Sequence, residues 1–233
     1  MSKFYYITVS TKPHPILELL EKSVKEKKEK VDILGIELNK NIGWDGKTST
    51  GHFGLKLQLF WEYVMHPRLK KDDIVLFSDA FDVLYVGTQK EIIKRYLEFK
   101  KPIVFGAEAG CWPDPSVRKK YKDTSHRFSF LNSGLFIGRV WAFRELHADY
   151  KFDNAEDDQR YWTKKYLSRP GLFALDYNNK LFLNCYTVKK EEINIVSKSC
   201  AKFGKANPMF LHFNGDTKST LLETHFARDY MSK

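Results

Sequence analysis

The chain alternates between short apolar runs and longer stretches whose apolar residues recur at helical spacing. The short runs are rich in β-branched and aromatic residues, and two of them are continuous enough to be strands buried on both faces. The polar triplet Asn132-Ser133-Gly134 is expected to interrupt the last of them. Five strands are predicted in this way: Phe4–Val9, Val31–Ile36, Ile74–Phe77, Ile103–Phe105 and Phe128–Ile137.

Between and after these runs the spacing changes to that of amphipathic helices. A polar, Gly-rich loop over Asn39–Gly51 carries Trp44. Beyond Pro170, shorter β-like runs lie around Leu172, Leu181 and Met209–His212. Five helices are predicted: Pro15–Glu29, Phe53–Met65, Gln89–Phe99, Val140–Tyr150 and Asp157–Leu167.

Strand–helix alternation with buried apolar strands predicts an α/β fold, with helices flanking a mainly parallel central sheet. The 233 residues show no linker and no internal repeat, so we expect a single domain over residues 1–233. Sheets of this kind bind ligands at the carboxyl ends of their strands. The residues that directly follow each strand are therefore the candidates for a functional site.

The net charge of +10 indicates an anionic partner. Nucleic acid is not favoured, because glutamates interleave the basic run Lys22–Lys30 and no aromatic residue interrupts it. No apolar run approaches the roughly 18 residues that a membrane span needs. No signal peptide is visible, and three cysteines show neither disulfide nor zinc-site spacing. These features predict a soluble protein in a reducing compartment, by default cytoplasmic, without a membrane partner.

The sharpest chemical motif follows the apolar run Ile74–Phe77. Asp79 and Asp82 stand three residues apart directly after it. At the end of a buried strand, two such carboxylates can point into one cleft and hold a hard divalent ion such as Mg²⁺ or Mn²⁺. The structural alternative is a turn in which the aspartates cap the strand end or the next helix.

A second acidic pair, Asp157 and Asp158, opens a predicted helix. Aspartate is favoured there simply because it caps backbone amides and complements the helix dipole. The functional alternative is a pair of carboxylates that stabilises positive charge at a sugar carbon or activates a hydroxyl.

The third motif is a histidine followed by a glycine turn. His212 ends a β-like run, Gly215 allows backbone amides to approach a ligand, and Lys218 supplies positive charge. A lone histidine is more often structural, so this one becomes informative only if it meets Asp79 and Asp82 in space.

Taken together, these segments resemble the glycosyltransferase domain of the procollagen lysyl hydroxylase family. The resemblance runs from the first strand to about Lys218. The matching segments are Ile7–Thr11, Val75–Val83, Ala107–Pro113, Phe130–Gly138, Asp157–Gln159 and His212–Gly215.

The resemblance implies a GT-A type fold and a stand-alone, Mn²⁺-dependent, retaining transferase. Its donor would be UDP-glucose and its acceptor galactosyl-hydroxylysine of collagen-like proteins. By the same resemblance, Mn²⁺ would be held by Asp79, Asp82 and His212, and Asp157 and Asp158 would face the transferred sugar. The nucleotide would be held by Val9, Ser10, Thr11, Trp44, Asp79, Ala80, Phe81, Gly215, Asp216, Thr217 and Lys218. The sugar and acceptor pocket would be shaped by Glu108, Trp112, Asn132 and Asn214.

This sequence departs from the family pattern at two places that bear on the sugar. The acidic run before Gln159 is shorter, and Leu59 stands near an expected aromatic residue. A galactosyltransferase that moves galactose from UDP-galactose to hydroxylysine is therefore the close alternative. A non-catalytic UDP-sugar-binding module and a Mg²⁺-dependent nuclease are the remaining alternatives.

Overall fold

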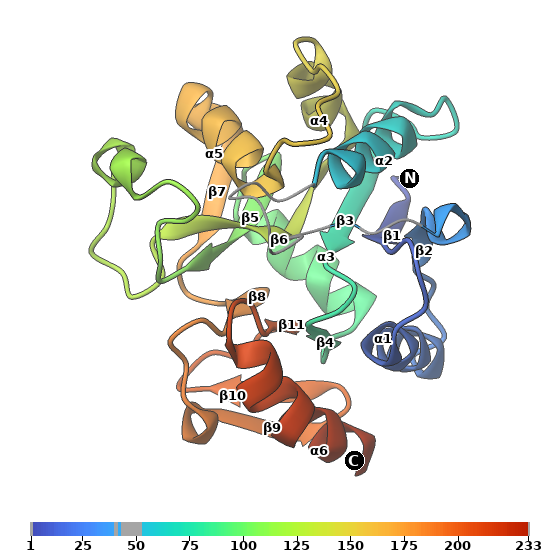
Figure 1. The fold of residues 1–233 in the computed structure, drawn as a ribbon, viewed down its shortest axis with the longest axis vertical. Coiled ribbons are helices and arrows are strands. Elements are labelled where there is room, and N and C mark those ends of the chain that lie inside the picture. The colour runs from blue at the N-terminus through green and yellow to red at the C-terminus, as the bar shows by residue number, and fades with distance from the viewer. Residues whose placement is uncertain (1, 40–41, 43–52, 233) are drawn as a thin grey trace.

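The computed structural model describes residues 2–39, 42 and 53–232, and its centre is a six-stranded sheet (Figure 1). The strand order across this sheet is β2-β1-β3-β6-β5-β7. Its strands are β1 (Phe4–Val9), β2 (Asp32–Leu34), β3 (Ile74–Ser78), β5 (Ile103–Glu108), β6 (Phe130–Arg139) and β7 (Phe173–Asp176).

The sheet is mixed and mainly parallel, which confirms the predicted fold class. β1 pairs in parallel with β2 and β3, and β5 with β7, whereas β6 is antiparallel to both of its neighbours. The expected interruption at Asn132–Gly134 does not split the strand, because β6 runs through it. It affects the pairing with β5 instead, in which Phe105 pairs with Phe136 and the next residue, Gly106, pairs with Asn132.

Helices cover both faces of this sheet, since successive side chains of a strand point to opposite sides. On one face, Val75 and Phe77 pack in one core cluster with α2 (Gly54–Met65), α4 (Val140–His147) and α5 (Asp158–Ser168). On the other face, Ile74 and Leu76 pack with α1 (Pro15–Glu26) and α3 (Gln89–Glu98). α1 ends before the predicted Glu29, and Lys28 there takes a left-handed φ of 57°.

A smaller set of elements packs beside the carboxyl end of β3, in the lower half of Figure 1. A three-stranded sheet has the order β4-β11-β8, and β9 and β10 form a hairpin. β4 is short and was missed by the sequence analysis. The elements are β4 (Val83–Tyr85), β8 (Phe182–Asn184), β9 (Ile193–Ser197), β10 (Cys200–Phe203), β11 (Phe210–His212), a π-helix (Lys218–Phe226) and α6 (Ala227–Ser232).

Four short 3₁₀ helices connect these elements: Ile36–Leu38, Pro115–Lys120, Pro170–Leu172 and Lys190–Glu192. In the part of the chain that the structure describes, no helix has both the length and the apolar character needed to cross a membrane.

Candidate functional site

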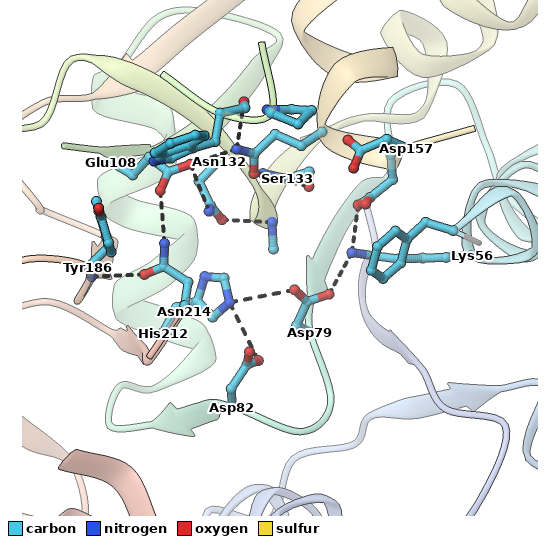
Figure 2. A pocket seen from close by; sticks show the side chains of 17 residues that line it. Lys56, Asp79, Asp82, Glu108, Asn132, Ser133, Asp157, Tyr186, His212 and Asn214 are labelled. Atoms are coloured by element: carbon cyan, nitrogen blue, oxygen red, sulfur yellow. Dashed lines mark hydrogen bonds and ion pairs between the residues drawn. The ribbon is translucent and has the colours of Figure 1, made fainter. Parts of the chain in front are cut away.

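A cavity of about 410 Å³ opens beyond the carboxyl end of β3, where the two sheets meet (Figure 2). It brings together most of the predicted site residues: Asp79, Asp82, Glu108, Trp112, Asn132, Asp157, Asp158, His212, Asn214 and Gly215. It also contains residues that the sequence analysis did not single out: Phe53, Lys56, Pro113, Ser133, Gly134, Gln159 and Tyr186.

Asp79, Asp82 and His212 form a cluster suited to a divalent cation. One ligand atom from each lies within 4.8 Å of the other two. His212 Nε2 is 3.5 Å from Asp79 Oδ2 and 3.4 Å from Asp82 Oδ1. β11 supplies the histidine and the turn between β3 and β4 supplies the carboxylates, which the antiparallel pairing of β11 with β4 brings together. The condition that the sequence analysis set for His212 is therefore met.

The orientation of the His212 ring follows from its neighbours. Asn184 Nδ2 donates to the Ala107 carbonyl at 3.0 Å, which leaves Asn184 Oδ1 to face His212 Nδ1 at 2.7 Å. Because this oxygen can only accept, Nδ1 carries a proton, and Nε2 is the nitrogen that faces the carboxylates and would bind a cation. A second hydrogen bond of this kind is typical of metal-binding histidines, so the three residues fit a divalent ion.

The charges in this cluster support one another. Burial by itself lowers the pKa of His212, but the nearby Asp82 and then Asp79 outweigh it and raise that pKa. Burial likewise opposes ionisation of Asp82, yet His212, followed by Lys218 and Lys56, holds the pKa of Asp82 below its usual range. The cluster therefore keeps the half-buried Asp82 carboxylate ionised, as a cation site requires.

Gly134 of β6 is the position that leaves room for the cluster. A Cβ placed there would lie 2.2 Å from His212 Cε1 and 2.6 Å from Asp79 Oδ2. We expect Gly134→Ala to push both ligands apart and to lower the affinity for Mn²⁺ by roughly 10- to 100-fold, as loss of ligand positioning does at other metal sites. Mn²⁺ binding followed by electron paramagnetic resonance measures this.

Gly171→Ala is the matched control, because a Cβ at Gly171 meets no atom within 4 Å. It should bind Mn²⁺ like the unmodified chain. Unchanged Mn²⁺ affinity in folded Gly134→Ala would show that Asp79 and His212 do not act as a pair.

Lys56 of α2 joins the metal cluster to the second acidic pair. Its Nζ lies 2.6 Å from Asp79 Oδ1 and 2.6 Å from Asp158 Oδ2 (Figure 2). Burial disfavours its charge, but Asp158 and then Asp79 more than compensate and raise the pKa of Lys56. Its position in an apolar, helical stretch gave no signal in the sequence. Lys56 is therefore a charged, fixed group between the two candidate centres.

The two adjacent aspartates at the start of α5 have different surroundings. Asp157 is the N-cap of the helix, and its Oδ1 accepts from the Arg160 amide at 2.8 Å. Burial, and then the charge of Asp158, raise the pKa of Asp157. Asp158 instead forms the ion pair with Lys56. The capping role considered for this pair thus applies to Asp157, while both side chains line the cavity.

A polar network around Glu108 lines the opposite side of the cavity. Glu108 Oε1 accepts from Gln159 Nε2 at 2.6 Å and from Asn132 Nδ2 at 3.3 Å. Its Oε2 accepts from Asn214 Nδ2 at 2.9 Å. Gln159 also donates to the Trp112 carbonyl and accepts from the Ser133 amide. These bonds fix the orientation of several polar groups that can contact a sugar.

Glu108 should make the stability of the fold depend on pH. Burial raises the pKa of Glu108 to about 7, against the lowering effect of its hydrogen bonds. The folded chain therefore binds this proton more tightly than the unfolded chain, and stability falls as pH rises from about 4.5 through 7. The loss should approach about 3 kcal/mol relative to Glu108→Gln, whose side chain does not titrate.

Denaturant unfolding of both proteins between pH 4.5 and 8 measures this difference. The variant also loses a hydrogen bond to Asn214, but that cost is the same at every pH. Equal slopes of stability against pH in the two proteins would contradict the assignment.

The remaining nucleotide-site predictions are not among the residues that line the cavity. Val9 ends β1, which pairs with β3, and Ser10 and Thr11 follow it, whereas Trp44 lies outside the described residues. Ala80 is buried and Phe81 packs against His14, with ring centroids 4.6 Å apart.

The glycine turn behind His212 leads into the π-helix. Gly215 has a left-handed φ of 68°, and the Thr217 hydroxyl donates to the Asn214 carbonyl. The Asp216 carbonyl accepts from Thr220 in the first turn of the helix. Lys218 Nζ lies 5.8 Å from the centroid of the Phe81 ring, so its charge stands beside the metal cluster.

Comparison with known proteins supplies relatives along most of the chain. The chain is 32% identical over 228 residues to mouse (Mus musculus) procollagen-lysine,2-oxoglutarate 5-dioxygenase 2, and the match covers 94% of this chain and 30% of the relative. It is 29% identical over 171 residues to the human (Homo sapiens) multifunctional procollagen lysine hydroxylase and glycosyltransferase LH3, covering 70% of this chain and 23% of the relative. The chain thus spans less than a third of the length of these relatives.

Among solved structures, the chain is similar to a glycosyltransferase involved in the glycosylation of the major capsid of PBCV-1. The TM-score is 0.52 at 13% identity, and the match covers 93% of this chain and 96% of the other. This likeness concerns the fold, and it confirms the expected GT-A type architecture.

The family model described as PLOD GT domain matches residues 1–232. This match and the relatives agree with the resemblance drawn from the motifs, and the chain therefore belongs to the PLOD GT domain family.

Proposed function

We propose that the chain is a Mn²⁺-dependent glycosyltransferase that moves glucose from UDP-glucose to galactosyl-hydroxylysine of collagen-like proteins. The observation that carries this proposal is one cavity that holds both a cation cluster and a separate acidic pair, joined through Lys56. The family supports transfer of a sugar, and the names of the relatives, which are procollagen-modifying enzymes, support a collagen-related acceptor.

The ligand types support manganese. Two carboxylates and an imidazole form a mixed oxygen and nitrogen set. Mg²⁺ prefers oxygen ligands alone, whereas Mn²⁺ accepts imidazole more readily. When bound by Asp79, Asp82 and His212, the ion would neutralise charge on the diphosphate leaving group.

Different residues around the cluster would bind different parts of the donor. Gly215 and Lys218, with the Asp216-Thr217 turn, would hold the diphosphate, and Lys218 already stands near Asp82. The uridine would lie toward Val9, Ser10, Thr11 and Trp44.

The reacting sugar would lie between the acidic pair and the Glu108 network. Asp158 would stabilise positive charge at the anomeric carbon, with Lys56 holding its carboxylate in place. Asn132, Asn214, Glu108 and Trp112 would contact the hydroxyl groups and faces of the two sugars. Glucose and galactose differ at one hydroxyl, so the fixed donors and acceptors around Glu108 are the groups placed to distinguish them.

The test measures UDP release from UDP-glucose, UDP-galactose and UDP-N-acetylglucosamine, each with Mn²⁺ or with EDTA. Every reaction is run with and without a galactosyl-hydroxylysine peptide and a hydroxylysine peptide. We expect release from UDP-glucose that requires Mn²⁺ and rises with the galactosylated acceptor. Release from UDP-galactose with the hydroxylysine peptide would establish the alternative transferase. Mn²⁺-dependent UDP binding without release from any donor would indicate a binding module.

A further inference from the structure

Beside the cavity lies a second groove, and we propose that it receives the acceptor polypeptide next to the modified residue and favours a segment with a carboxylate side chain. This inference rests on the proposed function, because it assigns the acceptor of that reaction to a place on the surface. The groove has a volume of about 480 Å³ and lies between the 3₁₀ helix Pro115–Lys120 and α5. In Figure 1 these are the short green helix at the left and the orange helix beside it.

The groove adjoins the cavity, because Trp112 and Pro113 line both. Trp112 is 51% exposed, although tryptophan is usually well covered in a folded protein. An exposed aromatic residue at the junction of two depressions is suited to pack against a bound chain.

The polar lining of the groove is mainly positive. Lys120, Arg160 and Lys164 contribute three cations, and Asp114 contributes one carboxylate. Asp114 already accepts from the Ser116 amide at 3.0 Å, as the cap of the 3₁₀ helix. Lys164 forms an ion pair with Glu156, with Nζ 3.5 Å from Oε2. Within residues 2–39, 42 and 53–232, neither Lys120 nor Arg160 forms an ion pair with a carboxylate. The pKa of Asp114 is lowered first by its hydrogen bonds to Ser116 and then by the nearby Arg160 and Lys120. Three cations against this one carboxylate still leave the groove positive overall, which favours an acidic partner.

The rest of the lining suits a polypeptide rather than a small anion. Val117 and Leu167 give the groove apolar walls, and Ser168 adds a hydroxyl group. A chain with both apolar and acidic side chains would satisfy this combination. A small anion would use only the cations.

α5 connects the groove to the reacting centre. Asp158 begins this helix, and Arg160 and Lys164 follow on it. With a rise of about 1.5 Å per residue, Arg160 and Lys164 lie roughly 3 and 9 Å along the axis from Asp158. An extended chain covers these distances in about one to three residues. We therefore place the favoured carboxylate within three residues of the modified lysine.

The experiment compares two labelled collagen-like peptides that carry galactosyl-hydroxylysine. The two peptides differ only at the positions two and three residues from the modified lysine. These positions hold glutamate in one peptide and glutamine in the other. Fluorescence anisotropy with UDP and Mn²⁺ gives the Kd of each. We expect the glutamate peptide to bind about fivefold more tightly at low salt, and the difference to shrink at high salt.

The variants Lys120→Gln and Arg160→Gln, singly and together, should remove this preference. The Arg160 amide that donates to Asp157 is a backbone group and is kept. Lys119→Gln is the matched control, since Lys119 belongs to the same 3₁₀ helix but does not line the groove. It should keep the preference.

Equal affinity for both peptides, or a preference that the groove variants leave unchanged, would overturn the inference. The donor assay described above separates this failure from failure of the proposed function. Sugar transfer without a preference between the two peptides would contradict only the role assigned to the groove. A preference for the glutamate peptide that depends on the groove residues, without sugar transfer from any donor, would contradict only the proposed reaction.

Discussion

In the presence of Mn²⁺, His212→Ala is expected to lower the affinity for UDP by more than about 100-fold. Loss of a residue that only orients a metal ligand already lowers metal affinity by roughly 10- to 100-fold, and His212 is itself a proposed ligand. The substitution removes the one nitrogen ligand and leaves the charged Asp79 and Asp82 facing each other. Calorimetric titration of UDP in the presence of Mn²⁺ or EDTA measures the effect.

Asp82→Asn keeps the volume of the side chain and should also lose the Mn²⁺-dependent part of UDP binding. His66→Ala is the matched control, because His66 is exposed and lies outside the cavity. Full Mn²⁺-dependent binding by folded His212→Ala would contradict the assignment of the three ligands. UDP binding that ignores EDTA in the unmodified chain would contradict it as well.

Asp158→Asn is expected to reduce kcat by about 10²- to 10⁴-fold while Mn²⁺-dependent UDP binding survives. The physical reason is position: Asp158 is held by Lys56 on the side of the cavity away from His212, so its charge would act on the sugar. Single-turnover transfer from UDP-glucose and UDP titration measure the two quantities separately.

Asp153→Asn provides the control, since Asp153 is an exposed carboxylate shortly before α5. Asp157 is a less direct test, because Asp157→Ala also removes the helix cap, at a cost of about 1 kcal/mol of stability. If Asp158→Asn loses UDP binding in parallel with turnover, Asp158 belongs to nucleotide binding and the role assigned to it is wrong.

The elements of the fold were largely predictable because their signals are local. The continuous apolar run before Asp79 identified β3, and helical spacing identified α2, α3 and α5 within one or two residues. β6 was found, and the expected break at Asn132–Gly134 affects only its pairing with β5, not the strand itself. Three polar residues in a row usually argue against a buried strand, but here their polar groups form hydrogen bonds inside the protein. Asn132 donates to Glu108, and the Ser133 amide donates to Gln159.

The family was also predictable, since the order of its motifs along the chain is itself a property of the sequence. Lys56 and Gln159 were missed for the opposite reason. A lysine in an apolar helix and a glutamine after two aspartates look like ordinary surface residues. Their importance depends on what faces them, namely Asp79 and Asp158 for Lys56, and Glu108 and Trp112 for Gln159.

By itself, the sequence determined the main strands of the large sheet and the helices on its two faces, the α/β class, the acidic pair after β3 and the membership of the family. These depend on periodicity and on motifs within a few residues. Only the tertiary structure decided that β6 runs antiparallel, that His212 meets Asp79 and Asp82, and that Lys56 joins them to Asp158. Such contacts arise when apolar faces from distant segments pack together, and the local pattern of the chain does not specify which faces will meet.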